Sequence, residues 1–273
     1  MKKTLVSLAM VAMFGLAASP ASADVLFTIQ EGSVPGTTPN LVSADLINGS
    51  YREQLTIFNN LTFSTFAVAD FGQYLLNAVP QISYLGNNPS LTSYRLYGLF
   101  NATGTVNPGA QSFTGSTGSV QLYVDPNSDT TKTLVNGSTP VMLGGGTTDD
   151  YLVASSSNFE SGFGIFSGTT GAFDLFFRNL VLTSGDNNGI GGANTAFAGL
   201  QNGDLFFTSP RPFNLRANLD GDFNQPSFAP GEQTLRGDLS IVFLAVPEPE
   251  GLALMGIALA GLGFSQRRRK LAK

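Results

Sequence analysis

The amino-acid sequence predicts an all-β protein whose body folds as an antiparallel β-sandwich or jelly roll. Short apolar runs rich in β-branched and aromatic residues recur along the chain and are broken by Gly, Asn and Pro, while the periodicity of amphipathic helices is absent. The 22 phenylalanines can fill a large core although the chain has no tryptophan. Residues 24–245 fit one such domain, flanked by two segments of different composition, 1–23 and 246–273.

The expected strands are separated by turn residues at regular intervals. Asn59-Asn60 divides two of them and is a hairpin signal. The glycine-rich segment Gly185–Asn194 is expected to be a flexible loop. The predicted strands are Val25–Ile29, Tyr51–Phe58, Leu61–Val68, Tyr94–Asn101, Ser119–Val124, Tyr151–Ser156, Phe173–Thr183, Gly203–Thr208, Phe213–Ala217 and Gln233–Ala245.

The strand predicted at Phe173–Thr183 has two unlike faces. Phe173, Leu175 and Phe177 lie on one face because side chains alternate along a strand. Asp174 and Arg178 then lie on the opposite face, so the strand is expected in the middle of a packed sheet.

The N-terminal segment has the three parts of a secretory signal peptide. Lys2 and Lys3 form a positively charged start, Leu5–Ala18 an apolar stretch, and Ala21 and Ala23 the small residues of a cleavage site. The mature chain is expected to begin at Asp24 after export through the Sec translocon.

The C-terminal segment also has three parts in a fixed order. The triplet Pro247, Glu248, Pro249 precedes an uncharged run, Gly251–Phe264, of about 21 Å as a helix, which is shorter than the roughly 30 Å hydrocarbon core of a bilayer. A basic cluster follows and favours the cytoplasmic side of a membrane. The cluster consists of Arg267, Arg268, Arg269 and Lys270.

This arrangement resembles the PEP-CTERM sorting signal of exported bacterial proteins, which the membrane transpeptidase exosortase processes. The resemblance implies that Pro247, Glu248 and Pro249 are the recognition triplet and that cleavage occurs close by. It implies transient insertion of the C-terminal helix in the inner membrane, with the basic cluster as a membrane stop. The body is then expected outside the cytoplasm.

The composition excludes several classes of function. Cys and His are absent, which rules out disulfides, thiolate or histidine metal sites and Ser-His-Asp triads. The span Asp24–Val246 holds 7 of the 14 basic and 17 of the 19 acidic residues, so its net charge is near −10. Nucleic acid and anionic lipid are therefore not expected partners.

Two segments place oxygen side chains at alternate positions, as calcium loops do. The first contains Asp220, Asp222 and Asn224, but the loop positions that require Gly and Glu in an EF-hand do not match, so a solvated turn is the alternative. The second contains Asp125, Asn127 and Asp129 with the same mismatch. No other cofactor is expected.

Paired carboxylates could run a glycosidase without histidine. The body glutamates Glu31, Glu53, Glu160 and Glu232 lie in four different segments, so four surface residues are expected instead of a catalytic pair. Sugar binding by aromatic stacking could use any of the tyrosines. These are Tyr51, Tyr74, Tyr84, Tyr94, Tyr97, Tyr123 and Tyr151.

The body also resembles the flocculation-associated PEP-CTERM protein family of the PepA type. This resemblance implies a surface or matrix protein, not an enzyme, that promotes flocculation or biofilm formation by associating with exopolysaccharide outside a Gram-negative bacterium. The alternatives are a calcium-dependent adhesin or lectin, and a carboxylate-dependent enzyme that modifies polysaccharide. The resemblance rests on ADLINGSYREQLTI (44–57), FSTFAVADFGQYLLN (63–77), YRLYGLF (94–100), GAFDLFFRNLVLTSGDNNG (171–189) and FFTSPRPFNLRANLDGDFN (206–224).

Overall fold

The structure is a computed structural model of the chain. It describes residues 26–86, 93–134, 141–167, 170–183, 205–209, 213–223 and 228–245. The predicted signal peptide, the predicted loop Gly185–Asn194, Asn224 and the segment 246–273 lie outside the described residues.

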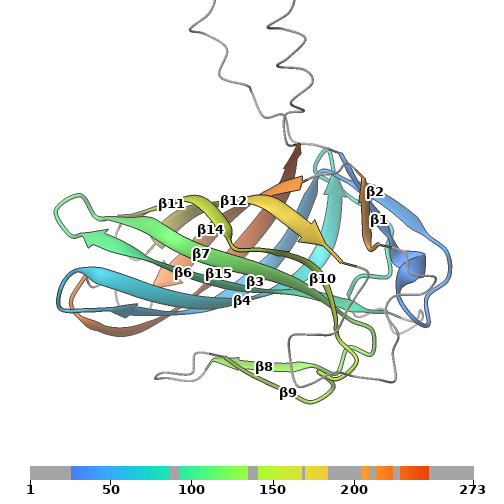
Figure 1. The fold of residues 1–273 in the computed structure, drawn as a ribbon, viewed down its shortest axis with the longest axis horizontal. Coiled ribbons are helices and arrows are strands. Elements are labelled where there is room, and N and C mark those ends of the chain that lie inside the picture. Colours follow the sequence, from blue (N-terminus) through green and yellow to red (C-terminus); the bar gives the residue numbers. More distant parts are fainter. Residues whose placement is uncertain are drawn as a thin grey trace, which may run out of the picture.

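Eight long antiparallel strands form one sheet that closes on itself (Figure 1). They are β3 (Leu46–Ile57), β4 (Thr62–Leu76), β6 (Arg95–Asn107), β7 (Ser112–Asp125), β11 (Asn158–Ser167), β12 (Thr170–Leu182), β14 (Phe213–Phe223) and β15 (Gly231–Ala245). Their order is β12-β11-β7-β6-β4-β3-β15-β14, and β14 pairs back onto β12. We call this ring the closed sheet.

The predicted all-β, antiparallel class is confirmed. Opposite walls of the closed sheet pack across one interior, as the two layers of a sandwich do, and the ring joins them along both sides. The predicted hairpin across Asn59-Asn60 is confirmed as β3 and β4. Strand β15 agrees with the predicted last strand of the body.

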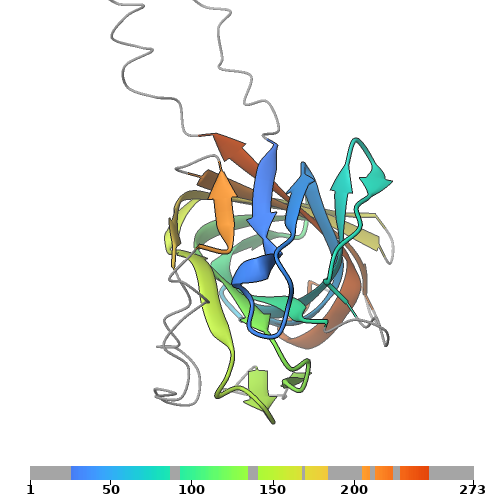
Figure 2. The same cartoon turned by 90° about the vertical axis from the view of Figure 1, so that its right-hand side faces the viewer.

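A small sheet covers one end of the closed sheet (Figure 2). It has the order β13-β1-β2, from β13 (Phe207–Ser209), β1 (Phe27–Gln30) and β2 (Leu41–Ala44), with the short 3-10 helix η1 (Glu31–Ser33) after β1. The ring of Phe27 meets that of Phe243 edge-on, 4.7 Å between centroids. Because Phe27 belongs to β1 and Phe243 to β15, the body starts and finishes at the same end.

The remaining strands are attached to the closed sheet. β10 (Tyr151–Ser156) pairs with β7 and β12 beyond the end of β11, and β5 (Val79–Pro80) pairs with β4. The hairpin of β8 (Thr131–Leu134) and β9 (Val141–Gly144) lies outside the sheet, where Lys132 Nζ is 2.7 Å from Asp70 Oδ1.

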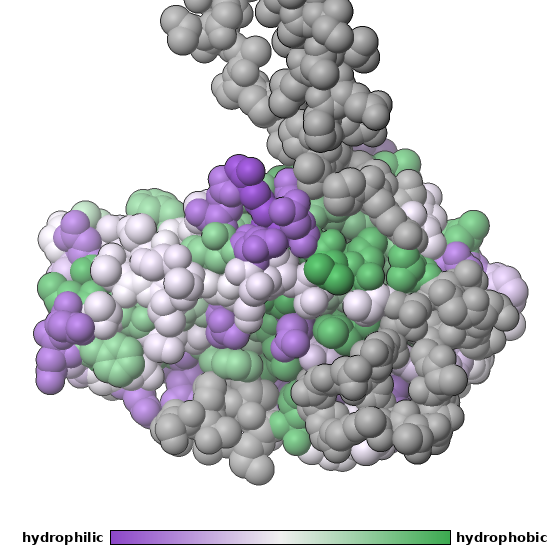
Figure 3. All heavy atoms as spheres, viewed as in Figure 1, coloured by the Kyte–Doolittle hydropathy of each residue, from purple (hydrophilic) through white to green (hydrophobic). Residues whose placement is uncertain are grey.

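The outside of the closed sheet carries hydrophobic patches among hydrophilic ones (Figure 3). No helix in the described part of the chain is long and apolar enough to cross a bilayer.

Strand β12 has the two faces that the sequence predicts. Phe177 is fully buried, and Phe173 and Leu175 pack against the core. Asp174 and Arg178 form ion pairs on the outside, with Arg216 and Glu160 respectively.

The sequence prediction is wrong at two places in the sheet. Strand β11, Asn158–Ser167, was not expected, and its interior positions include Gly162 and Gly164. The segment Asp220–Phe223, expected to be a turn or calcium loop, continues β14 and pairs with strands on both sides.

Interior glycines make room for the aromatic core. A Cβ at Gly162 would lie 2.6 Å from the Phe159 ring, and one at Gly221 would overlap the Tyr51 hydroxyl. That hydroxyl is buried and has no hydrogen-bond partner among the described residues. The strand next to the tip of the Tyr51 side chain therefore needs a residue without a Cβ.

Substitution of Gly221 by Ala is predicted to destabilise the body by about 1–3 kcal/mol, because the new methyl group must displace the Tyr51 hydroxyl. Tyr51→Phe in the same chain removes that hydroxyl and should restore most of the loss, since no hydrogen bond is given up. Urea unfolding measures both changes.

The matched control is Gly72→Ala on β4, where a Cβ would meet no atom within 4 Å. It should leave stability unchanged or slightly raised. Equal losses of stability in Gly72→Ala and Gly221→Ala would contradict the prediction, because they would show that the contact with Tyr51 has no effect of its own.

Candidate functional site

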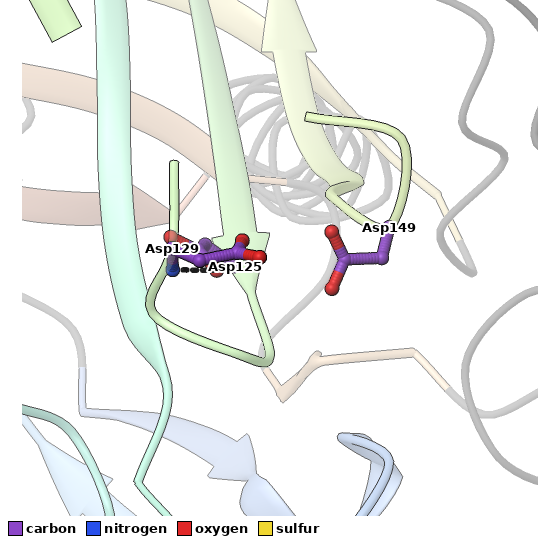
Figure 4. A group of neighbouring side chains, drawn as sticks. All are labelled: Asp125, Asp129 and Asp149. Carbon is purple, nitrogen blue, oxygen red and sulfur yellow. Dashed lines mark hydrogen bonds between the residues drawn. The ribbon is translucent and has the colours of Figure 1, made fainter. Parts of the chain in front are cut away.

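Three carboxylates, one from the end of β7 and two from loops, meet at one end of β7 (Figure 4). One carboxylate oxygen from each of Asp125, Asp129 and Asp149 lies within 4.8 Å of the others. Asp125 is the last residue of β7, Asp129 lies in the loop that follows it, and Asp149 comes from the loop before β10. We call these three residues the acidic loop site. Carboxylate oxygens gathered in this way are the ligands that calcium prefers.

Hydrogen bonds hold the two loops of the acidic loop site. The carboxylate of Asp125 accepts from the backbone N–H groups of Asp129, at 3.3 Å, and Thr130, at 3.1 Å. Asn127 Nδ2 donates to Asp149 Oδ2 at 2.5 Å. Burial raises the pKa of Asp149, and the nearby charges of Asp129 and Asp125 add to that effect.

The sequence pointed to only part of this site. Asp125 and Asp129 are members of the second predicted calcium segment. Its third member, Asn127, donates a hydrogen bond to Asp149 through its amide nitrogen, and this nitrogen cannot bind a cation. Asp149 was missed because it lies outside the spacing of any contiguous loop. The sequence signal was the aspartate pair Asp149-Asp150 that follows three glycines.

Asp150 belongs to the protein interior instead of the acidic loop site. Its carboxylate accepts from Tyr97 Oη at 2.5 Å and from Thr130 Oγ1 at 2.8 and 3.0 Å. Burial raises the pKa of Asp150 to about 7, against the opposing effect of these hydrogen bonds. The Tyr97–Asp150 contact ties β6 to the loop before β10.

The first predicted calcium segment does not form a loop. Asp220 and Asp222 are exposed on the outer face of a regular strand, and Asn224 lies outside the described residues. Among the residues that the structure describes, the acidic loop site is the one group of three acidic side chains with this spacing. The prediction of a loop or turn at Asp220–Phe223 is thus wrong, because this segment continues a strand that is paired on both sides, whereas calcium binding by Asp220 and Asp222 stays a prediction.

Two of the four glutamates expected on the surface are buried. Glu31, fully buried in η1, accepts hydrogen bonds from Tyr94 Oη at 2.8 Å, Asn40 Nδ2 at 2.5 Å and the backbone N–H of Tyr84 at 2.9 Å. Tyr94 Oη also lies 3.0 Å from Tyr74 Oη. Burial raises the pKa of Glu31, and the hydrogen bonds oppose this. Glu31 therefore anchors the covered end of the closed sheet.

Glu53 points into the interior from β3. It accepts a hydrogen bond from Thr65 Oγ1 and lines a cavity of about 40 Å³ with apolar neighbours that include Phe63, Phe113 and Phe173. Burial raises the pKa of Glu53 to about 7. The cavity has room for a few water molecules and none for a sugar.

The exposed glutamates Glu160 and Glu232 lie on the outside, and Glu160 pairs with Arg178. Glu31 and Glu53 share no hydrogen-bond partner and belong to different parts of the interior. Glu31 and Glu53 thus belong to separate hydrogen-bond networks.

The expectation of sugar stacking on tyrosine is wrong for all but one of the tyrosines. Tyr84 is partly exposed, and its hydroxyl contacts that of Thr38. Among the described residues, the strongly exposed aromatic side chains are Phe58 and Phe163. The buried tyrosines are Tyr51, Tyr74, Tyr94, Tyr97, Tyr123 and Tyr151.

Comparison with protein families finds a sorting signal at the end of β15. Residues 245–269 match the PEP-CTERM protein-sorting motif. The match includes Pro247, Glu248 and Pro249 and begins at Ala245, where β15 finishes. The protein is therefore an exported surface protein that exosortase processes. No curated protein and no solved structure matches the chain.

Glu53→Gln is predicted to alter how stability depends on pH. Folding raises the pKa of Glu53 from 4.5 to about 7. The contribution of the protonated carboxyl group to the free energy of unfolding is therefore fully present below pH 4.5 and is lost as the pH rises through 7. The variant should match the wild type at pH 4 and exceed it at pH 8 by on the order of 3 kcal/mol.

Denaturant unfolding at several pH values measures this difference. Glu232→Gln, at an exposed position, is the matched control and should leave the pH profile of the wild type unchanged. Parallel profiles for Glu53→Gln and the wild type would contradict the burial of a titrating carboxyl group.

Removal of the PEP-CTERM segment is predicted for the secreted protein. Intact-mass spectrometry of material from the producing organism should give an N-terminus at Asp24 and a C-terminus near Pro249. A C-terminus at Lys273 would contradict processing.

Proposed function

We propose that the mature body is a non-enzymatic protein of the cell surface or extracellular matrix that promotes flocculation or biofilm formation by associating with exopolysaccharide. It would reach this place through the Sec translocon and exosortase, after transient insertion of its C-terminal helix in the inner membrane of a Gram-negative bacterium.

The position of the PEP-CTERM motif carries this proposal. The motif begins as β15 finishes, and β15 pairs with β3 over residues 231–241 and with β14 over residues 235–245. Cleavage near Pro249 would remove no core strand, so the body can stay folded after it is released from the membrane. A stable, separable body is what a matrix protein requires.

The chemistry of the body supports a binding role more than catalysis. The chain has no His or Cys, and the buried glutamates Glu31 and Glu53 serve separate interior hydrogen-bond networks. The resemblance of the body segments to the flocculation-associated family supplies the specific role in flocculation.

Co-sedimentation of the mature protein with exopolysaccharide from the producing organism tests the proposal. We expect the protein to sediment with the polymer and to stay in the supernatant without it. A deletion strain should form fewer flocs and recover with the full chain. Protein that remains in the supernatant would contradict direct binding.

A calcium-dependent adhesin is the second candidate, and the acidic loop site favours it. Three carboxylates gathered at the end of β7 repel one another, and a bound cation would remove that repulsion. Bound calcium would also lock the two loops together.

Calcium is predicted to raise the melting temperature of the mature protein by several degrees at saturation, because it binds the folded chain alone. Asp149→Asn should abolish the increase, whereas Asp222→Asn, on the exposed face of β14, should retain it. An equal melting temperature in calcium and in EDTA would contradict the second candidate.

A further inference from the structure

A shallow groove of about 480 Å³ crosses the outer face of the closed sheet over β11, β12, β14 and β15. Its volume lies within the range of small-molecule sites. We call it the outer groove. The side chains that line it are those of Phe163, Ile165, Ala172, Asp174, Asn218, Asp220, Asp238 and Ser240, with Phe173 and Leu219 beneath.

The two sides of the outer groove differ in chemistry. Phe163 and Ile165 project from β11 and are 55% and 50% exposed. Asn218 and Ser240, directly opposite each other on β14 and β15, provide amide and hydroxyl groups on the other side. A pyranose ring has the matching pair of surfaces, since its C–H face is apolar and its edge carries hydrogen-bonding groups.

Two carboxylates face each other in the floor of the outer groove. Asp220 on β14 is the direct cross-strand partner of Asp238 on β15, and both are exposed. Like charges directly opposite each other destabilise a sheet. Neither residue takes part in an ion pair within the described part of the chain.

The rest of that cross-strand row offers no compensating charge. Ala172 is the partner of Asp220 on β12, and Ser50 is the partner of Asp238 on β3. The only lysine of the body, Lys132, is engaged with Asp70 on β4. Arg236 and Arg52 line the neighbouring hollow with this pair, but neither forms an ion pair with Asp220 or Asp238 within the described part of the chain. A ligand with a positive charge would therefore find two carboxylates without an ion-pair partner beside an apolar wall.

We propose that the outer groove binds a polysaccharide that carries free amino groups, such as a chain of glucosamine units. This inference rests on the proposed association with exopolysaccharide and names the kind of sugar and the place. The ammonium group lies between Asp220 and Asp238, the C–H face of a ring packs on Phe163, and ring hydroxyls bond Asn218 and Ser240. An anionic polymer is disfavoured because the body has a net charge near −10.

Isothermal titration of the mature protein with glucosamine oligosaccharides, and with N-acetylated oligosaccharides of equal length, tests the proposal. We expect the free amine form to bind at least tenfold more tightly, because acetylation removes the charge, and we expect salt to weaken binding. Absence of binding by the glucosamine oligosaccharides, or equal affinity for both forms, would overturn the proposal.

Variants locate the site. Asp220→Asn and Asp238→Asn should each weaken binding by about twofold to fivefold, the range of exposed charge pairs, and Phe163→Ala by about fivefold. Asp222→Asn is the matched control, since Asp222 lies on the same strand but outside the outer groove and opposite Arg236. Equal effects at Asp220 and Asp222 would overturn the assignment.

Without ligand, the asparagine variants should also melt slightly higher than the wild type, because one of the two opposed charges is gone. A lower melting temperature would show that the carboxylate pair is not repulsive and would count against the proposal.

The native exopolysaccharide separates this inference from the proposed function. One outcome is that the Asp220→Asn and Phe163→Ala variants sediment with the native polymer as the wild type does while glucosamine oligosaccharides do not bind. That result would overturn the assignment of the outer groove as the binding site and would leave the proposed function standing. Failure of the wild type to bind either polymer would overturn both.

Discussion

The pairing of β12 with β14 is the interaction on which the rest of the structure depends. It joins the segment 170–180 to the segment 213–222 and turns a row of strands into a ring. Without it both strands would have free edges, and the phenylalanine core behind them would be open to water. The same seam forms the floor of the outer groove, since Ala172, Asn218 and Asp220 lie on these two strands.

Closure of the sheet also places the first and the last strand of the body at the same end of the ring. β15 lies next to β14 in the ring, and its Phe243 packs against Phe27 of β1 at the covered end. The buried Glu31 network holds that end together through Tyr94 and Asn40. The PEP-CTERM motif follows at once, so the body is complete before the processed segment begins.

The sequence predicted the parts of the fold that depend on local pattern. Strands with alternating β-branched and aromatic residues, such as β3, β4 and β12, were found, as was the C-terminal sorting motif. β11 was missed because glycines occupy its interior positions, where the Phe159 and Phe173 rings of neighbouring positions supply the apolar contact. Asp220–Phe223 was misread because aspartate and glycine usually mark turns, whereas here pairing on both sides keeps them extended.

The candidate sites were less predictable because they depend on contacts between distant segments. Asp149 joins Asp125 and Asp129 across two loops, and the opposition of Asp220 and Asp238 appears only once the register of β14 and β15 is known. Burial reversed the expectation for Glu31, Glu53 and most tyrosines, since their polar atoms find partners or packing inside.

Residue-resolved hydrogen exchange of the mature body, measured by NMR, tests the closure most directly. In a closed sheet, successive amides along 170–177 and 213–222 have partners on alternate sides, so all of them should exchange slowly and to a similar degree. If every second amide of both strands exchanged as fast as an exposed loop, β12 and β14 would be free edges, and the account of the core, the outer groove and the covered end would be contradicted.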